Sequence, residues 1–241
     1  MISCVCPSHN RLAACYNTQM GLTIHYSLHA DPCPPAGARQ FVERLHQRAL
    51  DLPFIEVGEI VEYEGDECDF ERREEDDPDR WLLVQASRVS EAELVPPTHL
   101  IAFSTWPAEG CEQANFGLAM YPAAKPGWDW ASFCKIQYAS NPNYKGIDNF
   151  LRAHLTVVTL LDFAQELGIL EAVKDEGGFW EKRDAKDLVE TVGRWNEVIA
   201  GLAGQFKDLL GGRTQAEITN YPDFEHLEAK GRDSNDPHPS E

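Results

Sequence analysis

A cysteine and a lysine stand side by side at positions 134 and 135, in the stretch WDWASFCKIQYASNPNYKGIDNF. A cysteine thiol becomes a nucleophile when a nearby cation lowers its pKa. The stretch 131–138 has the composition of a β-strand, however, and side chains along a strand point alternately to opposite faces. Cys134 then shares a face with Ile136 and Tyr138, whereas Lys135 points the other way. The sequence therefore predicts a packed, unreactive thiol rather than a nucleophile.

The residues around this strand could instead bind a small anion. Between positions 122 and 155, four basic residues and two acidic residues give a local charge of +2, in a protein whose net charge is −19. The sequence SNPNYKG then leads into a predicted helix, whose first backbone N–H groups are free to hold an anion. The predicted ligand-binding residues, with Tyr138 or His154 as a proton donor, are Lys135, Gln137, Tyr138, Lys145, Arg152 and His154. In the alternative interpretation, Arg152 pairs with Asp148 one helical turn away and the lysines are solvated.

The most concentrated charge lies between Glu56 and Asp79, where thirteen acidic residues and two arginines, Arg72 and Arg73, give a local charge of −11. The stretch lacks the regular spacing of aspartates and the closing glutamate of a calcium-binding loop. It is either a solvated connection between strands or a contact for a basic protein, whose association the negative charge would accelerate. The carboxylates predicted for such a contact are Asp66, Glu67, Asp69, Glu71, Glu74, Glu75, Asp76 and Asp77.

Two histidines, His25 and His29, suggest a metal site at first sight. They lie four residues apart in a predicted strand, which separates them by about 13 Å, too far to bind one ion. The sequence also lacks the phosphate-binding loop, the dinucleotide-binding glycines, the nucleophile elbow and the His-Glu-x-x-His motif. We therefore expect no metal and no cofactor, and no motif identifies a reaction.

Composition narrows the class of protein further. The 241 residues are 43% hydrophobic and 25% charged, which is typical of a globular domain. The net charge of −19 makes nucleic acid and anionic membranes unfavourable partners. The longest apolar stretch, LTVVTLLDFA, is interrupted by Asp162 and is too short to span a membrane. The odd number of dispersed cysteines indicates reduced thiols and a cytoplasmic location. The seven cysteines are Cys4, Cys6, Cys15, Cys33, Cys68, Cys111 and Cys134.

The first nineteen residues, MISCVCPSHNRLAACYNTQ, allow three interpretations. LAAC, ending at Cys15, is similar to a lipoprotein cleavage box, but no continuous apolar segment precedes it. Cys4, Cys6, His9 and Cys15 could bind zinc, although they lack the usual Cys-x-x-Cys spacing. The third interpretation, which we favour, is a loosely ordered extension before a domain that begins near Met20.

The predicted elements define a fold class. Strict alternation predicts a strand over 22–28, and further extended segments are predicted at 54–63, 80–86, 99–106, 115–121 and 131–138. Helical spacing predicts helices over 38–51, 147–168 and 188–209, the last with Asp184 as N-cap and Gly211 and Gly212 as its end. Residues 169–182 are predicted to form a hairpin or a pair of short strands around a glycine turn. These elements predict an α+β fold, a mostly antiparallel sheet of about five to seven strands with two or three helices packed on one face.

We expect one domain over residues 21–212, preceded by the extension 1–20 and followed by an irregular tail over 213–241. The absence of catalytic motifs and the acidic stretch together favour a non-catalytic cytoplasmic interaction or regulatory protein. The alternative is an enzyme or binding protein for a small anionic ligand at the strand, loop and helix of residues 131–152.

Overall fold

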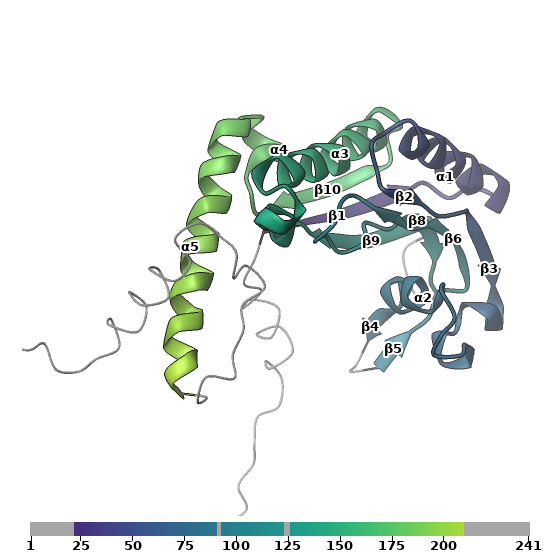
Figure 1. The fold of residues 1–241 in the computed structure, drawn as a ribbon. Helices are drawn as coiled ribbons and strands as arrows, with labels where there is room; N and C mark the ends of the chain where they lie inside the picture. Colours follow the sequence, from purple (N-terminus) through teal and green to yellow (C-terminus); the bar gives the residue numbers. More distant parts are fainter. Residues whose placement is uncertain (1–21, 91–92, 123–125, 210–241) are drawn as a thin grey trace, which may run out of the picture.

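An antiparallel β-sheet forms the frame of the protein in the computed structural model, which describes residues 22–90, 93–122 and 126–209 (Figure 1). Within these residues, six strands pair in the order β10-β1-β9-β8-β6-β3. They are β1 (Thr23–Ala30), β3 (Val61–Glu64), β6 (His99–Phe103), β8 (Phe116–Met120), β9 (Trp128–Lys135) and β10 (Leu170–Asp175). Two short antiparallel pairs flank the sheet, β2 (Glu56–Val57) with β7 (Thr105–Trp106) and β4 (Arg88–Ser90) with β5 (Glu93–Val95). The predicted α+β class and antiparallel sheet are confirmed.

Strand β1 shows why the sheet has one strongly apolar face. Its apolar residues alternate with polar ones, so that Ile24, Tyr26 and Leu28 are buried on the same side. The register places them opposite Cys134, Ser132 and Trp130 of β9, which extends the apolar layer to the next strand. The strand predicted over 22–28 is therefore confirmed, and it lies inside the sheet rather than at an edge.

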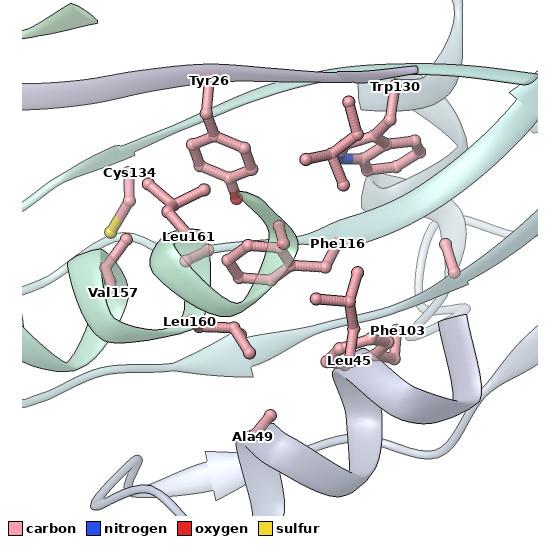
Figure 2. Close-up of a cluster of buried hydrophobic side chains, with 14 of the residues drawn as sticks. Tyr26, Leu45, Ala49, Phe103, Phe116, Trp130, Cys134, Val157, Leu160 and Leu161 are labelled. Atoms are coloured by element: carbon pink, nitrogen blue, oxygen red, sulfur yellow. The ribbon is translucent and has the colours of Figure 1, made fainter. Parts of the chain in front are cut away.

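Two long helices cover this face (Figure 1). Helix α1 (Pro35–Leu50) begins with a proline, which suits the first helical position, and it buries one stripe of side chains. Helix α3 (Ile147–Glu166) does the same over five turns. Figure 2 shows side chains of both helices meeting aromatic residues of the sheet, namely Tyr26, Phe103, Phe116 and Trp130. The helices predicted over 38–51 and 147–168 are confirmed.

The strand predicted over 80–86 is wrong, because this segment forms helix α2 (Arg80–Ala86). A short apolar stretch without clear alternation is compatible with either structure. The helical form places Leu82, Leu83 and Ala86 on one buried side. Figure 1 shows α2 on the side of the sheet opposite to α1 and α3, where it contacts β6 and β9.

The hairpin predicted over 169–182 is also wrong. Its first half is strand β10, which pairs with the distant strand β1 along nearly its whole length. The chain then turns at Gly178, whose positive φ of 72° suits glycine, into the short helix α4 (Phe179–Lys182). Pairing with β1 adds β10 to a large sheet, whereas an isolated two-stranded hairpin is only marginally stable.

Helix α5 (Ala185–Leu209) follows α4 and runs past the sheet on one side (Figure 1). Asp184 caps it as predicted, because its Oδ1 accepts hydrogen bonds from the backbone N–H groups of Lys186 and Asp187 at 2.9 and 3.2 Å. Several predicted features lie outside the described residues, namely the extension 1–20, the helix end at Gly211 and Gly212, and the tail 213–241. None of the helices in the described part combines the length and the apolar composition needed to cross a membrane.

Candidate functional sites

The end of β9 determines where the predicted anion-binding residues lie. The strand stops at Lys135 and the chain continues as a 3-10 turn over Gln137–Ser140, so the strand predicted as far as Tyr138 is too long. Ile136 leaves the extended conformation, with φ −114° and ψ −17°. Gln137 is consequently fully buried and does not share an exposed face with Lys135.

Cys134 lies inside the apolar layer, as the sequence predicts. Its side chain is 0% exposed and its Sγ donates a hydrogen bond to the backbone carbonyl of Glu112 at 3.2 Å. Burial raises the pKa of the Cys134 thiol well above its usual value. A thiol in this environment does not supply a thiolate nucleophile.

The other predicted residues have partners in different parts of the fold. The Lys135 ammonium lies 4.8 Å from the centre of the Tyr138 ring, a cation–π contact. Arg152 donates to the backbone carbonyl of Pro53 at 2.7 Å and to Oδ1 of Asn149 at 3.0 Å, so the expected pairing with Asp148 is not observed. Lys135 and Tyr138 therefore contact each other, whereas Arg152 is held by Pro53 and Asn149.

His154 forms a buried pair with Asp175 of β10. Its Nε2 donates to Asp175 Oδ2 at 2.9 Å, and the carboxylate also accepts from the backbone N–H groups of Gly177 and Trp180 at 2.8 and 2.9 Å. Burial alone would raise the pKa of Asp175, but the hydrogen bond and the charge of His154 outweigh it and hold that pKa below its usual value. The side chains of His154 and Asp175 are 1% and 0% exposed, so this pair ties α3 to the end of the sheet and is closed to a substrate.

A cavity lies between the start of α3 and α5, beside the predicted anion site. Its volume is about 570 Å³, and it is lined by Ser140, Pro142, Lys145, Gly146, Ile147, Val189 and Gly193. Among these described residues, Lys145 alone carries a charge. Of the six predicted ligand-binding residues, Lys145 is the one among the described residues that line this cavity.

A buried polar network fixes one wall of this cavity. Gln137 accepts from the backbone N–H of Leu22 and donates to Oδ1 of Asn196 on α5, both at 3.0 Å. Asn196 in turn donates to Oγ of Ser140 at 3.0 Å. Because all of these side chains are buried, the network holds α5 at a defined position against the 3-10 turn. The role of Asn196 could not be inferred from sequence, since its partners lie more than fifty residues away.

The acidic stretch contacts the sheet through several of its side chains. After β3, two 3-10 turns over Gly65–Cys68 and Phe70–Arg72 lead towards α2. Cys68 is buried, and burial raises its pKa to about 11. The Arg73 guanidinium lies 4.3 Å from the centre of the Tyr63 ring, and the Tyr63 hydroxyl donates to Asp79 at 2.7 Å. These contacts connect the acidic stretch to Tyr63 of β3.

Only part of the negative charge is compensated locally. Arg72 pairs with Asp66 at 2.7 Å and with Asp69 at 3.3 Å, and Arg73 pairs with Asp77 at 3.3 Å. The remaining predicted carboxylates are exposed and form no ion pair within the described part of the chain, these being Glu67, Glu71, Glu74, Glu75 and Asp76. We call these five residues the free acidic set.

A large aromatic side chain follows the acidic stretch. Trp81, in the first turn of α2, is 54% exposed, which is unusual for tryptophan. Trp81 is only two residues beyond Asp79, so an aromatic surface and exposed carboxylates occur in one short region. Tryptophan is among the residues that contribute most to protein interfaces.

His25 and His29 lie on one side of β1, as expected, and each has its own carboxylate partner. His29 Nδ1 lies 2.6 Å from Oδ1 of Asp129, which also pairs with Arg88 at 3.3 Å. His25 Nε2 lies 3.6 Å from Glu176. Among the described residues, no group of three or more His, Cys, Asp or Glu side chains is arranged to hold a metal ion.

Comparisons with protein-family models, with curated proteins and with solved structures found no match for this chain. Two features of the described structure point to a function, the acidic region before α2 and the cavity between α3 and α5.

Proposed function

We propose that this protein is a non-catalytic cytoplasmic interaction protein that binds a basic protein partner through its acidic region. The observation that carries the proposal is the free acidic set, five exposed carboxylates without an arginine partner in the described structure, followed a few residues later in the sequence by the exposed Trp81. Exposed charges of one sign accelerate the encounter with a partner of opposite sign. Trp81 supplies apolar area, which charge alone lacks, to hold the partner after the encounter.

The test removes charge without removing the pairs that hold the region together. Glu71, Glu74 and Glu75 are changed to glutamine and Asp76 to asparagine, while Asp66, Asp69 and Asp77 keep their arginines. The rate of association with a lysine-rich peptide, and then with partners captured from the source cell, is measured between low and physiological salt. We expect slower association and a weaker dependence on salt, because the attraction is screened within about 10 Å at 0.1 M salt.

A matched control removes the same number of charges elsewhere. Glu166, Glu171, Glu181 and Glu190 are exposed and lie on other elements, and all four are changed to glutamine. If the control slows association as much as the first variant, the effect comes from net charge and the proposed surface is wrong.

A second candidate function is favoured by the cavity between α3 and α5. Its size and its single lysine support the binding of a small anionic ligand, at the region 131–152 where the sequence predicts one. Thermal unfolding with inorganic phosphate and with carboxylates of increasing chain length, from acetate to octanoate, at an ionic strength matched with chloride, tests this function. An unchanged midpoint with every anion would exclude it.

A further inference from the structure

Two residues that line the cavity occupy positions where another amino acid would favour the fold. Lys145 has a φ of 73° and a ψ of 12°, in the left-handed region that favours glycine. A lysine side chain is thus retained at a strained backbone position, and it lines the cavity. Strained positions are found preferentially at functional sites.

Gly193 is the second such residue. It lies inside helix α5, where glycine is among the least favourable residues because it leaves the backbone flexible in the unfolded chain. The lack of a side chain there keeps the wall of the cavity open. Both departures from local preference therefore act on the same space, one by leaving room and the other by supplying a charge.

We propose that this cavity binds an organic monoanion with an apolar body, of the class of a medium-chain carboxylate. The volume of about 570 Å³ lies within the range of about 300–1,000 Å³ that is typical of small-molecule sites. Pro142, Ile147 and Val189 offer apolar surface to the body of the ligand, and the Lys145 ammonium pairs with its carboxylate. This inference rests on the second candidate function and specifies its ligand.

The chemistry of the lining separates this class from inorganic anions. Phosphate would gain one ammonium partner but would leave the apolar walls in contact with water or with a strongly hydrated ion. A carboxylate with a hydrocarbon chain removes apolar surface from water at the same time as it pairs with Lys145. We therefore expect affinity to increase with the length of the chain.

The full-length protein is titrated with octanoate by calorimetry, with acetate, inorganic phosphate and the neutral analogue octanamide as comparisons. Octanoate is expected to bind one site, at least about tenfold more tightly than acetate or phosphate and about fivefold to tenfold more tightly than octanamide. Thermal unfolding with the same ligands gives an independent measure, because a ligand of the folded state raises the midpoint.

Two variants locate the binding site. Lys145→Gly is expected to raise the Kd for octanoate about fivefold to tenfold, whereas the free protein should unfold no more easily than the wild type, because the backbone at this position suits glycine. Gly193→Leu is expected to fill the space and raise the Kd at least about tenfold without lowering the midpoint of the free protein. Weaker binding without a loss of stability cannot come from partial unfolding.

Matched controls have the same chemistry at other exposed positions. Lys174→Ala removes one lysine from β10, and Val198→Leu enlarges a side chain of α5 that is 51% exposed and does not line the cavity. Both should leave the Kd for octanoate unchanged.

Three results would overturn the inference. If phosphate and acetate bind as tightly as octanoate, the apolar body has no role, although the second candidate function stands. If no anion binds, both the inference and that function are wrong. If octanoate binds but neither Lys145→Gly nor Gly193→Leu changes its Kd, the site is elsewhere.

Discussion

Replacing Asp175 with asparagine tests the account of the buried pair between α3 and the sheet. The buried carboxylate accepts three hydrogen bonds, one from Gly177 to Oδ1 and two from Trp180 and His154 to Oδ2. Asparagine has nearly the same shape but offers one acceptor oxygen and one NH₂ donor. Whichever way the amide is turned, at least one backbone N–H faces a donor and loses its partner.

The expected loss follows from these three bonds. A buried donor left without a partner costs about 1–3 kcal/mol, and a hydrogen bond to a charged group contributes about 1.5–3 kcal/mol. Because the amide retains part of the network, we expect Asp175→Asn to lower the free energy of unfolding by about 2–4 kcal/mol at neutral pH. For a domain of this size the melting midpoint should fall by about 5–15 °C.

The loss should depend on pH in a defined direction. The pKa of Asp175 is lowered in the folded protein, so the charged carboxylate stabilises the fold above its unfolded pKa of about 4. This contribution disappears as the pH falls through the lower, folded pKa. The difference between wild type and Asp175→Asn should therefore narrow below about pH 4.

Urea unfolding followed by tryptophan fluorescence, from acidic to neutral pH, measures both quantities. Glu171→Gln is the control, because this exposed carboxylate lies on the same strand and its loss should change stability by less than about 0.5 kcal/mol. A wild-type value for Asp175→Asn at neutral pH, or a difference that widens as the pH falls below about 4, would refute the reasoning.

Two further predictions concern α5 and the sheet. Asn196→Ala should lower the free energy of unfolding by about 1–3 kcal/mol, since it leaves the Gln137 amide buried without its acceptor. Relative to the wild type, this variant should increase the rate of amide hydrogen exchange more in α5 than in α1. Gly117→Ala should destabilise the protein by at least about 1–3 kcal/mol in urea unfolding, because the added Cβ would lie 2.4 Å from Cβ of Ala102 and 2.7 Å from the carbonyl oxygen of Ile101; wild-type stability in either variant would contradict the contacts described.

The parts of the fold that follow from sequence are those in which one local period decides the structure. In β1, alternate residues are apolar and one face is buried, so a period of two identifies the strand and the side that Tyr26 occupies. In α1, the stripe that includes Leu45 has the helical period. No distant contact is needed to interpret either pattern.

The incorrect predictions share a dependence on distant partners. The segment 80–86 is apolar on both of its possible faces, so the sheet surface against which it packs decides that α2 forms. Strand β10 pairs with β1, about 145 positions earlier in the chain, and this pairing replaces the local hairpin. Local propensity is a weak guide wherever such a surface already exists.

The candidate site shows the same limit. The rule of pairing at one helical turn predicts a contact between Arg152 and Asp148, but the long Arg152 side chain reaches the carbonyl of Pro53, 99 residues away. His154 appears in sequence as one polar residue on an apolar stripe, and its partner Asp175 belongs to the segment for which a hairpin was predicted. Charge alone marks Lys145 as a candidate in the sequence. The cavity that it lines has no local signal in the sequence, because Val189 and Gly193 of α5 complete its wall.

The acidic region and the cavity lie at opposite ends of the sheet, and this separation makes the two proposals independent. The acidic residues follow β3, one edge strand, whereas Val189 and Gly193 of the cavity wall belong to α5, which Figure 1 shows on the side of the sheet away from β3. Charges farther apart than about 10 Å are largely screened at 0.1 M salt. Neutralising Glu71, Glu74, Glu75 and Asp76 should therefore leave the Kd for octanoate within about twofold of the wild-type value at that salt concentration. A larger change would mean that the two ends communicate through the sheet or α5, and loss of the acidic charge could then no longer be interpreted as a local effect on partner binding.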